Sequence, residues 1–307
     1  MPLKVTILGA TSAKPSVSGH PSAQAVNVSE QLYLVDAGEG VQQQMFRNGL
    51  NPLRLRAVFI SHLHGDHVFG LFPLLSTMGL YGRQVPLKVF APAPFGEILE
   101  GYLRWFDDHL PYTVEWVEVD TTAHEKIFEN RTLEVWSIPL RHSLRSAGYL
   151  FREKEAPRNV DKFMIERHGL TIQQIVAAKR GEDIVLDDGT VLPNGRLTYV
   201  AHPAVSYAYC SDTSFSARAA EIVAGVDLLY HEATYAESER SVAGERGHST
   251  AKQAAEVARR AGAGRLLIGH FSSRYKEPQL LLDEARSVFA RTDIAVEGQT
   301  FEAVKCR

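Results

Sequence analysis

The sequence predicts an α/β protein in which β-sheets pack in the middle and helices cover the outside. Short apolar runs rich in β-branched and aromatic residues recur along the chain, and most are bounded by Gly, Pro, Asp or Ser. Strand-like runs dominate the early part, whereas strands and helices alternate towards the end. The chain has 307 residues, of which 45% are hydrophobic and 22% charged, so it can bury a sizeable core.

The elements follow in order from these patterns. Strands are expected at residues 4–8, 31–35, 57–60, 87–90, 113–119, 133–138, 147–151, 206–210, 228–230, 266–268 and 294–297. Helices are expected at residues 40–48, 68–81, 95–106, 217–224, 250–261 and 278–290. Residues 152–196 are charged and strand-poor, with a helix-like piece at 171–180. We interpret residues 1–307 as a single domain that carries residues 152–196 as an inserted arm.

Composition restricts the class of protein. The formal net charge is −3, so a nucleic-acid partner would have to be held by a local basic surface. Cys210 and Cys306 lie far apart and form no CxxC pair, which argues against a cysteine-rich zinc site and against a disulfide framework. No apolar run reaches the roughly 18 residues of a membrane span, and no signal peptide is apparent. We therefore expect a cytoplasmic protein.

The most informative segment is SHLHGDH at residues 61–67, directly after the expected strand at 57–60. It gathers three imidazoles and a carboxylate, groups that are expensive to bury without partners and that suit Zn²⁺. His62 and His64 are spaced to face one ion. Asp66 and His67 lie on the following turn and are placed to face a second ion, about 4 Å away in two-metal hydrolases.

Further polar residues follow later apolar runs. His142 comes after residues 133–138, Asp212 after residues 206–210, and His270 after residues 266–268. Residues at the ends of strands collect at one edge of an open α/β sheet, which is where such sheets place their sites. These three side chains are therefore candidates to complete the set of metal ligands.

The HxHxDH pattern resembles the signature of the metallo-β-lactamase superfamily. The resemblance implies an αββα four-layer sandwich with an inserted substrate-binding arm. It also implies two Zn²⁺ ions per chain, for which Mn²⁺ or Fe²⁺ could substitute, and no organic cofactor. One ion would be held by His62, His64 and His142, the other by Asp66, His67 and His270, with Asp212 bridging both.

Within the superfamily the chain resembles the ribonuclease Z proteins. The N-terminal LGATSAKPS is similar to their LGTGxxxP opening, HEAT stands at residues 231–234, and HST at 248–250. FSSRY at residues 271–275 matches the segment after their last zinc histidine, and about 70 residues separate His142 from Asp212, which leaves room for their arm. The arm reproduces their basic KxGE segment as KRGE, but Ile172-Gln173 replaces their Gly-Pro turn with a more helical sequence.

The resemblance gives these residues chemical roles. Metal ions lower the pKa of bound water and offset charge on phosphorus. Asp66 would orient that water and accept its proton. His248 would act as general acid or hold a phosphate oxygen, and Glu232 would raise its pKa and fix its tautomer. Asp36 and Glu39, in LVDAGEG, are expected to support the zinc histidines.

The leading hypothesis is an endoribonuclease that removes the 3′ trailer from precursor tRNA and leaves a 3′-hydroxyl on the tRNA and a 5′-phosphate on the trailer. The resemblance also implies a homodimer. A general phosphodiesterase or an arylsulfatase-like hydrolase with the same centre is the alternative, and a third is an RNA-binding protein that has lost activity. The other histidines are interpreted as structural or exposed: His20, His109, His124, His168, His202 and His231.

Overall fold

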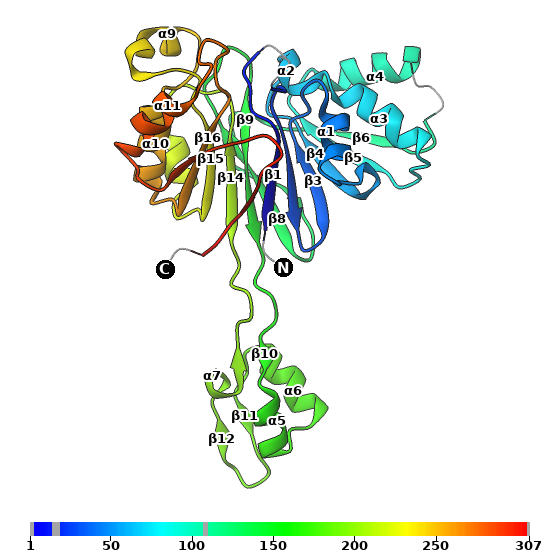
Figure 1. The fold of residues 1–307 in the computed structure, drawn as a ribbon. Coiled ribbons are helices and arrows are strands. Elements are labelled where there is room, and N and C mark those ends of the chain that lie inside the picture. Colours follow the sequence, from blue (N-terminus) through cyan, green and yellow to red (C-terminus); the bar gives the residue numbers. More distant parts are fainter. Residues whose placement is uncertain (1–2, 14–18, 107–109, 306–307) are drawn as a thin grey trace. The chain divides into compact units, whose positions relative to one another are not determined.

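The computed structural model describes residues 3–13, 19–106 and 110–305. The expectations for His109, for Cys306 and for the end of the LGATSAKPS segment lie outside these residues. The chain divides into two compact units, one formed by Met1–Glu153 and Val205–Arg307, the other by Lys154–Ala204 (Figure 1). None of the helices in the described ranges has the length and apolar character that crossing a bilayer requires.

The larger unit contains two mixed sheets, each of seven strands in the described residues. The first sheet has the order β18-β1-β2-β3-β4-β5-β6. Its strands are β1 (Lys4–Gly9), β2 (Ala23–Val28), β3 (Gln31–Val35), β4 (Leu55–Phe59), β5 (Leu87–Ala91), β6 (Val114–Glu118) and β18 (Thr300–Glu302). The second has the order β17-β16-β15-β14-β9-β8-β7. Its strands are β7 (Lys126–Glu129), β8 (Leu133–Pro139), β9 (Ala147–Glu153), β14 (Ser206–Cys210), β15 (Leu228–Glu232), β16 (Arg265–Gly269) and β17 (Thr292–Ile294).

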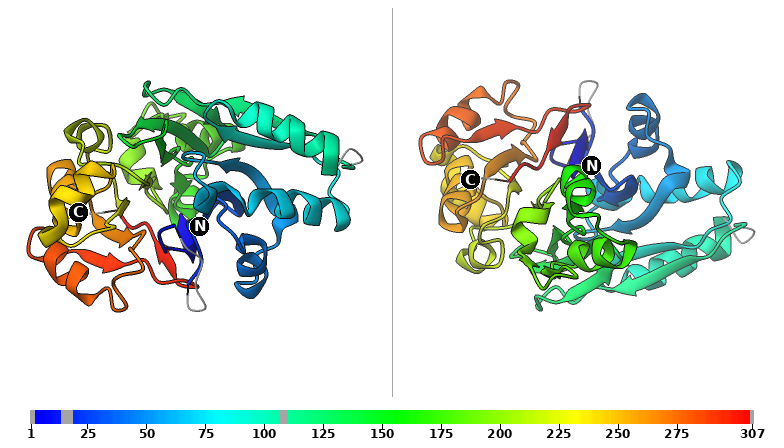
Figure 2. Two further views of the ribbon diagram at one scale, coloured as in Figure 1. Left: turned by 90° about the horizontal axis from the view of Figure 1, so that it is seen from above. Right: turned by 90° about the horizontal axis from the view of Figure 1, so that it is seen from below.

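Helices cover the outer face of each sheet (Figure 2). The first sheet packs against α1 (Val41–Arg47), α2 (Gly65–Val68), α3 (Leu71–Leu80) and α4 (Phe95–Phe106). The second packs against α8 (Ala217–Ile222), α10 (Ala251–Ala261) and α11 (Gln279–Arg286). The short α9 (Arg240–Glu245) and two 3₁₀ turns, Pro52–Arg54 and Glu237–Glu239, complete this unit.

The aromatic core lies between the two sheets and holds them together. Phe59 of the first sheet stacks on Phe90 at 4.8 Å and meets Phe151 of the second sheet edge-on at 5.4 Å. Tyr33 and Tyr207 are fully buried in the same cluster. With helices outside both sheets, the four layers are α, β, β and α, and the predicted sandwich is confirmed.

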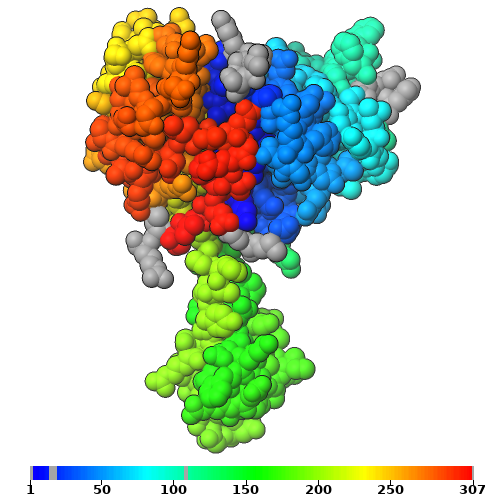
Figure 3. Space-filling model, viewed as in Figure 1, coloured from blue at the N-terminus to red at the C-terminus, as the bar shows by residue number. Residues whose placement is uncertain are grey.

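In the larger unit, the sequence patterns do not predict β2, β7 and β18, and one predicted strand is displaced. β2 (AQAVNV) contains Ala, Gln and Asn, which have low strand propensity, yet it is held between β1 and β3. β7 is short and half-exposed, and β18 has only three residues. β18 pairs with β1, so the C-terminal segment lies beside the N-terminal strand (Figure 3). The last predicted strand, 294–297, is found at Thr292–Ile294.

The smaller unit is built from short elements around its own small core. It contains the two-residue strands β10 (Asn159–Val160), β11 (Ile184–Val185), β12 (Val191–Leu192) and β13 (Thr198–Tyr199). Its helices are α5 (Lys162–His168), α6 (Ile172–Lys179) and α7 (Asn194–Leu197). Thr171 and Gln174 form a capping box that starts α6, so the helix-like piece expected at residues 171–180 is a helix. Val160, Leu170, Ala178, Ile184 and Leu197 are buried together.

The helix predicted over residues 68–81 is broken at Gly70. Its N–H donates to the carbonyl of Ala37 at 2.8 Å, and the N–H of Ala37 donates to the carbonyl of His67 at 2.7 Å. A Cβ at Gly70 would lie 2.0 Å from the carbonyl oxygen of Gly38. Only glycine therefore allows this close approach, which ties the loop after β3 to the helix that carries His67.

We predict that Gly70→Ala lowers the free energy of unfolding by about 1–3 kcal/mol, because the new methyl group collides with backbone that cannot move aside. Urea unfolding followed by circular dichroism measures this. The matched control is Gly101→Ala within α4, where an added Cβ meets nothing within 4 Å. That change is expected to leave stability equal or up to about 1 kcal/mol higher. Similar stability of the two variants would contradict the role of Gly70.

Candidate metal centre

Both sheets deliver polar residues to the same edge of the sandwich. The segment that follows β4 carries His62 and His64, and α2 then supplies Asp66 and His67. In the second sheet, the ends of β8, β14 and β16 lead into the loops that hold the remaining three candidates, His142, Asp212 and His270. The structure brings all seven predicted ligands together in two groups that share Asp212.

The first group has four members whose ligand atoms lie within 4.8 Å of one another. Nδ1 of His64 is 3.0 Å from Nε2 of His62 and 3.2 Å from Nε2 of His142. Oδ2 of Asp212 lies 3.6 Å from the His62 nitrogen and 3.8 Å from the His142 nitrogen. Three imidazoles and one carboxylate oxygen therefore point at a common position.

The second group consists of Asp66, His67 and His270. Oδ2 of Asp66 lies 3.5 Å from Nε2 of each imidazole. Asp212 reaches this group with its other oxygen, Oδ1, at 3.5 Å from His67 and 3.2 Å from His270. Asp212 thus presents one carboxylate oxygen to each group, which is the geometry of a bridging ligand.

Hydrogen bonds on the far side of the rings fix three of the histidine tautomers. His67 donates from Nδ1 to Asp36 at 2.8 Å, and His142 donates from Nδ1 to the carbonyl of Gly247 at 2.9 Å. His62 faces the hydroxyl of Ser61 at 3.0 Å, and that hydroxyl already donates to Asp36 at 2.8 Å. In the neutral ring each Nδ1 must therefore carry the proton, and each Nε2 then directs a lone pair to the centre of its group.

The ring nitrogens that face the centre are poorly satisfied without a cation. Nε2 of His67 and Nε2 of His270 are buried without a hydrogen-bond partner, which is costly for a polar atom in a protein interior. In the first group, ring nitrogens face one another at 3.0–3.2 Å. Cations placed among them would satisfy every one of these atoms. The histidine and aspartate clusters thus indicate a dinuclear metal site.

The electrostatics of the site also favour positive charge. Burial alone lowers the pKa of His67, but Asp212 and Asp36 outweigh it and raise that pKa well above its ordinary value. Burial alone raises the pKa of Asp66, yet the imidazoles of His270 and His67 hold it well below its usual range. Asp212 is held low in the same way by its surrounding histidines. Both carboxylates are consequently ionised at neutral pH.

Glu232 and His248 form a close pair next to the two groups, and His248 also forms a third group with Asp212 and His270 whose ligand atoms lie within 4.8 Å of one another. Oε1 of Glu232 lies 2.9 Å from Nδ1 of His248 and also accepts the backbone N–H groups of Thr213 and Ser249 at 3.1 Å. Glu232 is fully buried. Burial alone lowers the pKa of His248, but the Glu232 carboxylate outweighs it and raises the pKa to about 9. The imidazole is thereby held in place and kept protonated at neutral pH.

A cavity of about 470 Å³ opens onto the site. His64, Asp66, Asp212, His248 and His270 all line it, together with Glu39 and Phe69 among others. The N–H of Ala13 donates to Oδ2 of Asp66 at 2.8 Å, so the described start of the loop after β1 also reaches the site. A substrate in this cavity would meet the metal positions and His248 together.

Asp36 and Glu39, which were expected to support the zinc histidines, lie in different surroundings. Asp36 is buried and holds His67, whereas Glu39 is exposed and lies on the cavity wall. His20 contacts Glu297 and Gln44 and joins no metal cluster of the described residues. Sequence reasoning missed Ser61, Tyr209 and Thr234, whose hydroxyls bind Asp36 or Glu232. Ser61 opens the SHLHGDH segment and Thr234 ends the HEAT motif, so these two had a signal, whereas Tyr209 had none.

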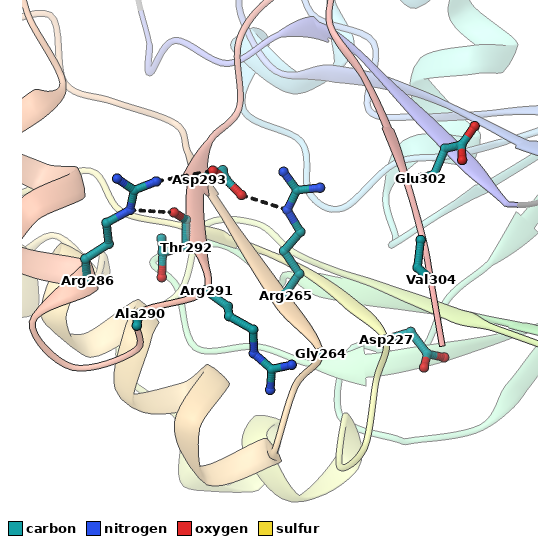
Figure 4. Close-up of a pocket in the computed structure, with 10 residues that line it drawn as sticks. All are labelled: Asp227, Gly264, Arg265, Arg286, Ala290, Arg291, Thr292, Asp293, Glu302 and Val304. Atoms are coloured by element: carbon teal, nitrogen blue, oxygen red, sulfur yellow. Dashed lines mark hydrogen bonds and ion pairs between the residues drawn. The ribbon is translucent and has the colours of Figure 1, made fainter. Parts of the chain in front are cut away.

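A second cavity, of about 410 Å³, lies at the opposite end of β15 and β16 (Figure 4). Arg265, Arg286 and Arg291 face it. Asp293 accepts from Arg265 at 2.7 Å and from Arg286 at 3.3 Å. One carboxylate thus already engages two of these guanidinium groups, and the cluster joins β17 to β16 and α11.

Comparisons with known proteins agree with this geometry. One family model that matches, over residues 3–164, is described as "Anti-Pycsar protein Apyc1", and another, over residues 159–271, as "Beta-lactamase superfamily domain". The structure resembles the crystal structure of human tRNase Z, short form, with a TM-score of 0.68 at 24% identity, covering 98% of this chain and 99% of that one. The predicted metallo-β-lactamase fold is thereby confirmed.

Sequence relatives are closer. The chain is 46% identical to "Ribonuclease Z" of Porphyromonas gingivalis and 43% identical to "Ribonuclease Z" of Bacteroides fragilis. Each match covers 95% of this chain and 96% of the relative. With this identity over nearly the full length of both proteins, the chain belongs to the ribonuclease Z family, the metal-dependent tRNA 3′-processing endoribonucleases of the metallo-β-lactamase superfamily.

Proposed function

We propose that this chain cuts the 3′ trailer from precursor tRNA at a centre of two Zn²⁺ ions, leaving a 3′-hydroxyl on the tRNA and a 5′-phosphate on the trailer. The observation that carries the proposal is the convergence of histidine lone pairs on either side of Asp212, next to a protonated His248 in the same cavity. Nitrogen and carboxylate ligands without sulfur suit Zn²⁺. His62, His64 and His142 would hold one ion, Asp66, His67 and His270 the other, and Asp212 would bridge them.

When bound, the two ions supply positive charge against the phosphoryl group and lower the pKa of a water molecule. Asp66 then orients the attacking water and takes up its proton. It is suited to orientation because its carboxylate stays ionised and one of its oxygens is itself held by the N–H of Ala13.

His248 supplies the proton that the departing 3′-oxygen needs. Its Nδ1 is held by Glu232, so Nε2 is the ring nitrogen left to serve the substrate. Glu232 is a positioning residue for proton delivery, because it is buried and can reach the substrate only through the His248 imidazole. This arrangement separates proton uptake at Asp66 from proton delivery at His248, as acid–base catalysis requires.

The smaller unit, Lys154–Ala204, is proposed to bind the tRNA and to take no part in the chemistry. Its ends enter and leave as neighbours, because Arg152 pairs with Ser206 and the N–H of Glu153 donates to the carbonyl of Val205 at 3.0 Å. It is therefore inserted in the chain between the paired ends of β9 and β14. That the chain works as a homodimer and in the cytoplasm stays a prediction.

A general phosphodiesterase or an arylsulfatase-like hydrolase would use the same ligands, so the metal centre does not separate these functions. The full-length relatives favour the ribonuclease. The direct test incubates the purified protein with a labelled precursor tRNA, with and without chelator, and maps the cut. Turnover of a small aryl phosphodiester without any cut in the precursor would favour the alternative.

Removing the bridging carboxylate should disturb both metal positions. We expect the parent to hold about two metal ions per chain, lost on chelation, and Asp212→Ala to lose both in a chelator competition read by mass spectrometry of the metals. Asp227→Ala is the matched control, because Asp227 is similarly buried but lies at the opposite end of β15. Retention of two tightly bound ions by Asp212→Ala would contradict the ligand assignment.

Removing the proton donor should matter only when the leaving group needs a proton. His248→Ala is expected to slow cleavage of precursor tRNA by about 10²–10⁴-fold, with unchanged metal content. An activated aryl phosphodiester, whose leaving group departs as an anion, should be affected far less. His124→Ala, which removes an imidazole outside the clusters, serves as control. Equal losses on both substrates would assign His248 to phosphate binding instead.

Deleting the smaller unit should separate binding from chemistry. Replacing residues 154–204 by a short Gly/Ser turn joins strand ends that already pair. Cleavage of precursor tRNA should weaken, whereas hydrolysis of a small aryl phosphodiester should persist, because no residue of the two metal groups or of the Glu232–His248 pair is removed. An equal loss of both activities would mean that this unit supports the fold and not the substrate.

A further inference from the structure

The hydroxyl of Thr234 joins the Glu232–His248 pair to the metal cluster. Thr234 is 2% exposed, and its Oγ1 donates to Oε2 of Glu232 at 2.8 Å. The same Oγ1 lies 2.9 Å from Nδ1 of His270. One side chain that touches neither substrate nor metal position therefore contacts both halves of the site.

The direction of these hydrogen bonds follows from counting protons. A threonine hydroxyl has a single hydrogen, and an ionised carboxylate can only accept. The Thr234 hydroxyl must therefore donate its hydrogen to Glu232, and its oxygen must accept a hydrogen bond from Nδ1 of His270. Nε2 of His270 is then left with its lone pair, and this is the buried atom that faces Asp66 and Asp212.

Thr234 donates to Glu232 because the Glu232 carboxylate is ionised, and the groups around Glu232 stabilise this ionised form. Besides the Thr234 hydroxyl, its two oxygens face His248 and accept the backbone N–H groups of Thr213, Thr234 and Ser249, at 2.9–3.1 Å. Every partner is a donor, so the carboxylate has no reason to carry a proton. Hydrogen bonding of this kind stabilises the ionised form.

We propose that Thr234 is a positioning residue that transmits the charge of Glu232 to His270 and so fixes the tautomer in which His270 can bind a metal ion. The inference rests on the proposed dinuclear function and deepens it. Three other histidines of the centre, His67, His62 and His142, are fixed by Asp36, by Ser61 and by a backbone carbonyl. Among the described ligand histidines whose Nδ1 has a hydrogen-bond partner, only His270 is linked to Glu232, through Thr234. Glu232 is also the carboxylate that holds His248.

The proposal predicts that Glu232→Gln changes the tautomer of His270. Three donors surround Oε1 and two surround Oε2, so the amide oxygen should take the Oε1 position and the amide nitrogen should face Thr234, whose backbone N–H then loses its acceptor. The amide would then donate to Oγ1, and the hydroxyl would donate to Nδ1 of His270 instead of accepting from it. Nε2 would consequently carry the proton and lose its capacity as a ligand. A carboxylate outside both metal groups would thereby control metal binding.

The test measures metal affinity of the full chain in the absence of substrate. Zn²⁺-loaded protein is titrated with a chromophoric chelator, and the two dissociation constants are compared between variants. Thr234→Val keeps the shape but removes the hydroxyl, and it should weaken one of the two ions by about 10–100-fold, the range for a lost partner of a metal-bound histidine. Thr234→Ser restores the hydroxyl and should restore the affinity.

A control variant and a second test variant complete the experiment. Thr292→Val removes a similarly buried hydroxyl that donates to a backbone carbonyl far from the site, and it should leave both affinities unchanged. Glu232→Gln should weaken the same ion as Thr234→Val. Parent-like affinity in folded Thr234→Val, or in Glu232→Gln if the valine variant does not fold, would overturn the inference. A parent chain that binds no pair of ions would instead overturn the proposed function.

Discussion

The buried carboxylate of Asp36 is the interaction on which the site depends most. Oδ1 accepts the N–H of Ser61 at 2.7 Å, and Oδ2 accepts from Ser61, His67 and Tyr209 at 2.6–2.8 Å. These donors come from the loop after β4, from α2 and from β14 of the other sheet. The Asp36 carboxylate therefore links both sheets to the segment that carries the ligands. A buried carboxylate without such donors would be strongly destabilising, which means that the fold requires the site's framework even before any metal binds.

The chain accepts local strain to place these groups. Asp36 and His270 both adopt left-handed backbone conformations, with φ of 55° and 59°, where non-glycine residues are uncommon. Each sits where the chain turns out of a strand, and each turn directs a side chain inward to the cluster. Burial of unpaired lone pairs on His67 and His270 adds to this strain. Metal binding would remove the cost of the unpaired ring nitrogens, so the stability of the fold and its metal content are coupled.

Much of this arrangement is predictable from sequence, and the reason is geometric. Polar residues that follow strand-like runs are candidates for a site at a sheet edge, which marked SHLHGDH, His142, Asp212 and His270, and the resemblance to the metallo-β-lactamase superfamily divided them between two ions. Tertiary contacts decide what could not be predicted. β2 is a strand because its neighbours pair with it, and the break at Gly70 comes from a carbonyl that is near only in the folded chain. Hydroxyl partners such as Tyr209 carry no local pattern at all.

The two ends of the reaction are connected through the protein and not only through the substrate. Glu232 holds His248 directly and reaches His270 through the hydroxyl of Thr234, so the group that delivers a proton and a group that would hold a metal share one carboxylate. Substitutions at Glu232 should therefore not act on proton delivery alone. This sharing gives a physical reason for the Glu-x-Thr spacing within HEAT: the carboxylate that holds His248 and the hydroxyl that links it to His270 lie two residues apart, and both are buried.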